Sequence, residues 1–188
     1  MTLLLKKKTM SNLSLWHDIP LGSKAPEEFN AIIEIPRGSS NKYEIDKETG
    51  LIKLDRVNYS ALYYPMDYGF APQTYWPDKD PLDILVITTH PLVSGLLVAV
   101  RPIAGIEMID DGDEDDKIIT VPVEDPRFLE FQDLKDLSAH TKAELKHFFE
   151  TSKQLMGKKV VVKSFYGKKT ALGKINRAVK LYKDKFGG

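Results

Sequence analysis

Short runs rich in β-branched and aromatic residues, separated by turn residues, follow one another along the chain up to residue 123. Such runs are typical of strands, and they predict strands at 29–35, 42–46, 51–57, 82–88, 96–109 and 118–123. The segment Lys47-Glu48-Thr49-Gly50 joins the second and third runs, and its glycine favours a hairpin turn. Gly105 lies inside the longest run and predicts a bend or bulge where a strand turns the corner of a barrel.

The hydrophobic period changes to that of helices after residue 140. Thr141 and Glu144 have the spacing of a capping box, which predicts a helix with Thr141 as its N-cap. The apolar stripe of this helix is expected to run from Leu145 to Leu155 and Met156. A strand at 158–166 and a second helix at 170–186 follow, with these side chains inward: Leu172, Ile175, Val179, Tyr182 and Phe186. Together the patterns predict an α+β fold, a small closed or nearly closed β-barrel with helices packed outside.

The 188 residues suit a single domain, which we expect to span 13–188 after a disordered leader at 1–12. In the leader, three leucines precede three lysines, the reverse of a signal peptide, and Met10 is an alternative start. The chain has no cysteine, which excludes disulfides, zinc thiolate sites and thiol catalysis. That composition fits a reducing cytosol, so we expect a cytoplasmic protein. No apolar run is long enough for a membrane span.

A formal net charge of zero conceals a strong asymmetry along the chain. Residues 151–188 carry eleven lysines and arginines and a single acid, Asp184, whereas the preceding part is acidic. A basic tail is a signal for nucleic-acid binding. We favour the simpler interpretation, in which these lysines form the solvated face of the C-terminal amphipathic helix.

Two acidic segments border the predicted strands and are typical of a site for a hard cation. Asp78, Asp80 and Asp83 stand directly before the apolar run 84–87, and the second segment, 110–116, is followed by Lys117. Mg²⁺ takes oxygen ligands and is normally bound by a few carboxylates together with substrate phosphates. Pro81 and the β-branched run behind it argue against the aspartate-rich helix of isoprenoid synthases. The spacing also fits neither the haloacid-dehalogenase motif nor an EF-hand loop.

A set of side chains that commonly bind phosphate accompanies these acids. Taken singly, each of them is more often a solvated cation or an aromatic residue at the edge of a core. Their occurrence together with the possible metal carboxylates favours an anionic, phosphate-bearing substrate. The set comprises Lys42, Arg56, Tyr64, Tyr68, Lys117 and Lys153.

The order of these motifs resembles that of the soluble family I inorganic pyrophosphatases, from about Pro26 to the C-terminus. The matching segments are Ile33-Glu34-Ile35-Pro36, Lys42-Tyr43-Glu44-Ile45-Asp46, Asp55-Arg56, Tyr64-Pro65-Met66-Asp67-Tyr68-Gly69, Asp78-Lys79-Asp80-Pro81-Leu82-Asp83, Arg101-Pro102, 110–117, and His147-Phe148-Phe149-Glu150 through Lys153. The resemblance implies an OB-like five-stranded barrel with flanking helices. It also implies an enzyme that hydrolyses pyrophosphate to two phosphates with metal-activated water.

The resemblance assigns a role to each matching residue. Asp78, Asp83 and Asp115 correspond to ligands of the first catalytic metal, with Asp83 bridging to a second. Asp110 corresponds to a ligand of a third metal, and Glu34 to an acid of the same site. Asp80 corresponds to the group that orients or deprotonates the attacking water. The expected phosphate contacts are Lys42, Arg56, Tyr68, Lys117 and Lys153, with Tyr64 and Glu44 lining the pocket.

Several Mg²⁺ ions per site are expected, with Mn²⁺ or Zn²⁺ as substitutes and Ca²⁺ as an inhibitor. Divalent cations are needed because a site made of carboxylates alone would repel pyrophosphate. Pyrophosphate is the expected partner, with neither nucleic acid nor membrane, and the resemblance implies a homohexamer built from two trimers. His147 is then an interface candidate, although a satisfied histidine at the edge of the core is an equally good interpretation.

Two residues depart from the family pattern. Lys79 places a cation beside the metal ligands, where it could weaken metal affinity or add a phosphate contact. We favour a stem that swings into solvent. Ser152 stands where the family generally has a phosphate-binding tyrosine, so we expect weaker pyrophosphate binding with retained catalysis. The alternatives to the hydrolase are an OB-type nucleic-acid-binding protein that uses the basic C-terminal face and, less favoured, a structural Ca²⁺-binding module.

Overall fold

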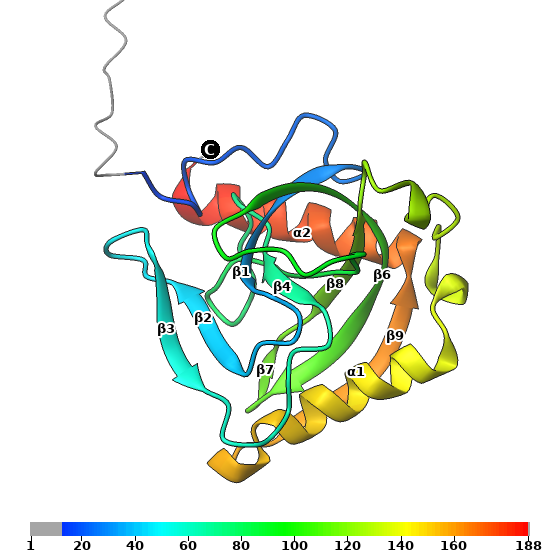
Figure 1. Ribbon diagram of the computed structural model, residues 1–188. Coiled ribbons are helices and arrows are strands. Elements are labelled where there is room, and N and C mark those ends of the chain that lie inside the picture. The colour runs from blue at the N-terminus through cyan, green and yellow to red at the C-terminus, as the bar shows by residue number, and fades with distance from the viewer. Residues whose placement is uncertain (1–12, 188) are drawn as a thin grey trace, which may run out of the picture.

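Five strands form a closed ring in the computed structural model, which describes residues 13–187 (Figure 1). They are β1 (Phe29–Ile35), β4 (Asp67–Phe70), β5 (Asp83–Val86), β8 (Lys117–Pro122) and β6 (Leu97–Asp110). Each pairs with the next in that order, and β6 pairs back with β1. Only the pairing of β5 with β8 is parallel among these five. The predicted five-stranded barrel is confirmed, whereas the leader expected at 1–12 lies outside the described residues.

Further strands extend the barrel at one side and leave a separate hairpin at another. β7 (Asp113–Glu114) and β9 (Val160–Gly167) both pair with β6. β2 (Asn41–Ile45) and β3 (Ile52–Val57) form a two-stranded sheet of their own, joined at the predicted turn. Gly50 in this turn has a φ of +74° and donates its N–H to Asp46 O at 2.7 Å. The hairpin prediction is therefore confirmed.

Two helices, α1 (Ala139–Ser152) and α2 (Lys168–Phe186), lie on opposite sides of the barrel (Figure 1). Leu85 and Ile119 pack in a cluster with Phe148 of α1, whereas their neighbours in β5 and β8 pack in a second cluster with Ile175 of α2. Strands buried on both faces read as continuous apolar runs, which is why 84–87 and 118–121 lack polar alternation. Short 3-10 turns lie at Pro126–Phe128, Leu134–Asp136 and Gln154–Met156.

The start and the end of α1 differ from the sequence prediction. Ser138 is the N-cap, and its Oγ accepts the Thr141 N–H at 2.9 Å, so the capping box at Thr141 is wrong. Ser138 and Thr141 are both good caps, and the earlier one adds most of a turn to the helix. The helix ends at Ser152, and Leu155 in the following 3-10 turn is 68% exposed rather than part of the apolar stripe.

The predicted second helix is confirmed as α2, but its last residue is not inward. Phe186 is 43% exposed, although its ring contacts that of Trp16 edge to face at 5.5 Å. Trp16 itself is buried, and neighbouring His17 Nδ1 lies 2.8 Å from the Tyr182 hydroxyl. The end of α2 is therefore covered by the N-terminal segment of the described chain.

Gly105 permits a close contact and is not the site of a bulge. The pairing of β6 with β8 shifts between Pro102 and Ala104, and that with β9 shifts between Glu107 and Met108. A Cβ at Gly105 would lie 2.2 Å from Cε2 of Tyr166. Glycine is required here because the Tyr166 ring lies directly on the backbone. Of the predicted bend or bulge, the bulge is wrong for this residue.

Candidate active site

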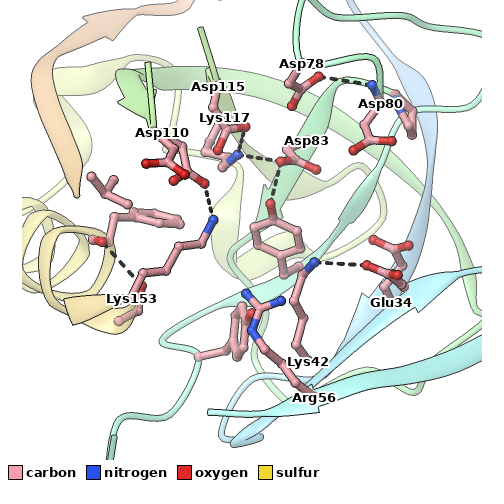
Figure 2. Close-up of a pocket in the computed structure, with 18 of the residues that line it drawn as sticks. Glu34, Lys42, Arg56, Asp78, Asp80, Asp83, Asp110, Asp115, Lys117 and Lys153 are labelled. Carbon is pink, nitrogen blue, oxygen red and sulfur yellow. Dashed lines mark hydrogen bonds and ion pairs between the residues drawn. The ribbon is translucent and has the colours of Figure 1, made fainter. Parts of the chain in front are cut away.

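One cleft of about 770 Å³ lies between the barrel, the β2–β3 hairpin and the end of α1. All thirteen residues that the sequence assigns to the site line it, although they come from seven different strands and the loops between them. Figure 2 shows Asp78, Asp83, Asp110 and Asp115 along one side, with Lys42 and Arg56 facing them from the hairpin. The fold thus sets Lys42 and Arg56 opposite the carboxylates of the barrel, while Lys117 and Lys153 lie among those carboxylates.

The parallel pairing of β5 with β8 brings the two acidic segments together. Asp83 is the first residue of β5 and Lys117 the first of β8, and the two are paired in register. Asp115 lies between β7 and β8, two residues before Lys117, and Asp78 lies in the loop before β5. Ligand oxygens of Asp78, Asp83 and Asp115 all lie within 4.8 Å of one another. Carboxylates at such separations repel one another unless a cation lies between them.

Lys117 is the cation that lies among these carboxylates. It is 2% exposed and forms ion pairs with both Asp83 and Asp115 (Figure 2). Burial raises the pKa of Asp83, and the Asp115 charge adds to the rise despite Lys117. Burial also acts to raise the pKa of Asp115, but the charge and hydrogen bond of Lys117 outweigh it and hold this pKa below its usual value. Tyr68 donates its hydroxyl to Asp83.

Two further acids have raised pKa values, as expected in a site with excess negative charge. Burial, reinforced by the Asp83 charge, raises the pKa of Glu34 to about 8 and that of Asp78 to about 7. Glu34 Oε1 accepts the Ile45 N–H at 2.7 Å, which ties β1 to the hairpin. Raised carboxyl pKa values mean that the charged forms lack sufficient partners within the protein. A divalent cation would supply the missing charge.

Asp110 gives a second sign that the site suits a metal. Its Oδ2 pairs with Lys153, which follows the end of α1. Its Oδ1 is buried and makes no hydrogen bond within 13–187. Buried polar atoms without a partner are rare in folded proteins, and a carboxylate oxygen in this state is free to bind a cation. The donor set, all carboxylate oxygen, is the kind that Mg²⁺ takes.

The opposite wall carries the cations and phenols expected to contact phosphate. Lys42 and Arg56 are paired in the β2–β3 ladder, so their side chains leave the same face. Lys42 Nζ lies 3.0 Å from Glu44 and 3.3 Å from Asp55, and Arg56 also pairs with Asp55. Burial raises the pKa of Tyr64 to about 12, so its hydroxyl stays a hydrogen-bond donor at neutral pH.

Asp80 has a partner that the sequence interpretation missed. It is half exposed and pairs with Lys47, from the tip of the hairpin. Lys47 Nζ also lies 5.2 Å from the centroid of the Trp16 ring, within cation–π range. A lysine in a turn carries no signal beyond that of a solvated charge, so the sequence could not have identified it.

The two departures from the family pattern lie at the cleft margin. Lys79 is exposed, as expected for a stem that swings into solvent, and its φ is +76°. Ser152 lines the cleft as the last residue of α1, and its hydroxyl donates to Phe149 O at 3.3 Å. His147 is exposed, so the interpretation as a histidine at the edge of the core is wrong.

The basic C-terminal segment lies mostly away from the cleft. No residue of α2 lines the cleft in the described part of the chain. Lys174 and Arg177 of this helix pair with Asp116 and Glu114, at 2.9 Å in each case. Within 13–187, neither α2 nor α1 is long and apolar enough to cross a membrane. Most of the basic residues of α2 are exposed, as expected for the outer face of an amphipathic helix, whereas Lys174 points to the buried Asp116.

Known proteins are similar to this chain in sequence and in fold. The inorganic pyrophosphatase family matches residues 31–183. "Soluble inorganic pyrophosphatase 1" of Arabidopsis thaliana is 44% identical over 167 residues, 89% of this chain and 79% of its own. A soluble inorganic pyrophosphatase of Zea mays is 46% identical over 167 residues, covering 89% and 78%.

Solved structures agree with these relatives. The inorganic pyrophosphatase of Thermus thermophilus superposes with a TM-score of 0.85 at 46% identity, covering 88% of this chain and 97% of that one. That of Helicobacter pylori gives 0.84 at 39% identity, covering 88% and 98%. With a family match over most of its length, this chain belongs to the soluble family I inorganic pyrophosphatases, the enzymes that hydrolyse inorganic pyrophosphate.

Proposed function

We propose that hydrolysis takes place in the cleft described above, with the acidic wall holding Mg²⁺ and the basic wall holding pyrophosphate. The observation that carries this is the convergence of Asp78, Asp83 and Asp115 oxygens within 4.8 Å. Family I pyrophosphatases are metal-dependent. When bound, Mg²⁺ supplies positive charge that attracts the anionic substrate and lowers the pKa of coordinated water.

The remaining roles follow from what each side chain can reach. Asp110 lies next to the central three carboxylates and Glu34 lies on the side of Lys42, and both would hold further Mg²⁺. Asp80, exposed at the mouth, accepts a proton from the attacking water or orients that water. Its pairing with Lys47 shows that the carboxylate can accept from a donor inside the cleft.

The cations neutralise charge on the two phosphoryl groups, the main electrostatic task of phosphoryl transfer. We assign Lys42, Arg56 and Lys153 to the phosphates because each pairs with a carboxylate in the cleft, whose place a phosphate oxygen can take. Lys117 and Tyr68 stand between the walls, and each donates to Asp83. Tyr64 and Glu44 complete the lining of the cleft.

Phosphate release from pyrophosphate, measured against Mg²⁺ concentration, tests the assignment. Asp83→Asn should abolish activity, because a neutral amide cannot hold the cation in place of the carboxylate. Asp113→Asn makes the same chemical change at an exposed acid of the same cleft and should retain activity. Equal activity of the two variants would contradict the site. Preference for ATP over pyrophosphate would contradict the substrate.

Metal replacement separates the hydrolase from the Ca²⁺-binding module. Mn²⁺ or Zn²⁺ should substitute for Mg²⁺, and Ca²⁺ should inhibit, because its longer bonds and variable geometry fit the reacting centre poorly.

We further propose a homohexamer of two trimers located in the cytoplasm. The exposed His147 on α1 is available for such an interface. Light scattering coupled to size-exclusion chromatography measures the mass, and that of a monomer would contradict the hexamer.

A further inference from the structure

A group of side chains on the far side of the barrel wall contacts both acidic segments from behind. Asp116 lies between Asp115 and Lys117, which both line the cleft, but it does not line the cleft itself. Its side chain is 1% exposed and accepts hydrogen bonds from two directions. Lys174 Nζ of α2 lies 2.9 Å from Asp116 Oδ2, and the Tyr166 hydroxyl of β9 donates to the same oxygen at 3.1 Å.

The same lysine also contacts the first acidic segment. Lys174 Nζ lies 5.5 Å from the centroid of the Trp76 ring, and the Arg177 guanidinium lies 4.7 Å from it. Trp76 is 1% exposed. Its backbone N–H donates to Asp80 O at 2.8 Å, and its carbonyl accepts the Lys79 N–H at 2.9 Å. Trp76 therefore closes the turn that carries Asp78 and Asp80.

The contact of Tyr166 with Asp116 depends on Gly105. Any side chain there would displace the Tyr166 ring, since a Cβ would lie 2.2 Å from it. A buried carboxylate is unfavourable unless it is paired and hydrogen-bonded. Asp116 meets this requirement with partners from α2 and β9. Neither element carries any of the carboxylates assigned to the metal.

We propose that Lys174 and Asp116 are positioning residues for the metal site. Lys174 holds the segment 115–117 through Asp116 and the turn 76–80 through Trp76, and so sets the distance between Asp115 and Asp78. This inference rests on the proposed function, because it takes these carboxylates to be metal ligands. Groups that orient metal ligands from behind commonly change metal affinity when they are replaced.

The experiment measures Mn²⁺ binding without pyrophosphate, by electron paramagnetic resonance, and Mg²⁺ activation separately. Lys174→Met removes the charge and keeps the length of the side chain, and Asp116→Asn keeps the shape of the carboxylate. Each should weaken Mn²⁺ binding by about tenfold. The Mg²⁺ concentration for half activation should rise with it, while kcat at saturating Mg²⁺ falls much less. Lys180→Met, at an exposed position of the same helix, should change neither.

The double variant Asp116→Asn/Lys174→Met leaves no unpaired buried charge and keeps the test valid if Lys174→Met alone fails to fold. A merely structural role would lower the melting temperature and leave the Mn²⁺ dissociation constant unchanged in folded protein. That result overturns the inference, as does equal weakening in Lys180→Met. Asp83→Asn separates the two proposals, because retained Mn²⁺ affinity there contradicts the metal site itself.

Discussion

Glu34→Gln should stabilise the metal-free enzyme at alkaline pH while it reduces activity. Glu34 is 7% exposed, and its pKa rises from 4.5 to about 8 because burial and the Asp83 charge oppose ionisation. Glutamine has the same shape, and its oxygen can still accept the Ile45 N–H. The substitution therefore removes the unfavourable charge without removing the hydrogen bond.

The size of the effect follows from linkage. Since the folded pKa of Glu34 lies above the unfolded one, ionisation destabilises the fold as pH rises above 4.5, and the full penalty is present above about 8. A rise of roughly 3.5 pKa units at about 1.4 kcal/mol each corresponds to about 5 kcal/mol at pH 9. At pH 5 the same relation gives a destabilisation by Glu34 of less than about 1 kcal/mol. For a chain of this length, 5 kcal/mol is on the order of 10 °C in melting temperature.

Thermal unfolding in EDTA, followed by circular dichroism at pH 5 and pH 9, measures the gain. Glu27→Gln, at an exposed glutamate that does not line the cleft, is the matched control and should show no gain at either pH. A Glu34→Gln protein no more stable than the parent at pH 9, or equally stabilised at pH 5, would refute the reasoning. Saturating Mg²⁺ should make the parent the more stable of the two proteins, because the parent binds the ion more tightly than the variant and is stabilised by it.

Three further predictions concern the cleft margin and the metal. Ser152→Tyr should lower KM for pyrophosphate by adding a phenol at the end of α1, and steady-state kinetics with an unchanged KM would count against it. Lys79→Gly should raise the free energy of unfolding by about 0.5–1 kcal/mol, because glycine adopts a φ of +76° without the strain of a side chain. Urea unfolding should show no such gain for Lys79→Ala, which keeps the strain. Mg²⁺ affinity, measured by calorimetry, should increase as pH rises to about 8. Asp78 and Glu34, with pKa values of about 7 and 8, must lose their protons before they can bind the ion. An affinity that does not depend on pH between 6 and 8 would exclude these two acids as ligands.

Sequence reasoning located most of the strands and the candidate residues because both depend on local signals. It missed β4 and β7, which at four and two residues are too short to give a strand pattern. Runs such as 84–87 are apolar and β-branched, and each acidic segment directly borders one of them. The two positions where local signals compete were predicted incorrectly. Ser138 and Thr141 are both good caps, and only the packing of the helix start selects Ser138. Gly105 suits a bulge or a close contact, and the position of Tyr166 decides between them.

Other parts of the site depend on pairings between distant segments, which no local pattern reveals. The register that sets Asp83 opposite Lys117 joins residues 34 positions apart. Lys47 reaches Asp80 only because the hairpin lies over the cleft, and Asp116 meets Lys174 only because α2 covers the barrel. These contacts come from closure of the ring and from the placement of the hairpin and α2 on it. Their residue types alone suggest solvated charges.

The hairpin that carries Lys42 and Arg56 is a sheet separate from the barrel that carries the carboxylates. Each sheet fixes the spacing within its own set of charges through its own backbone hydrogen bonds. The width of the cleft is therefore a geometric variable independent of either set. A small shift of the hairpin would bring both cations toward a bound substrate, while the spacing of Asp83, Asp110 and Lys117 on the barrel stays unchanged. Opening by the same shift would release phosphate without dismantling the metal site.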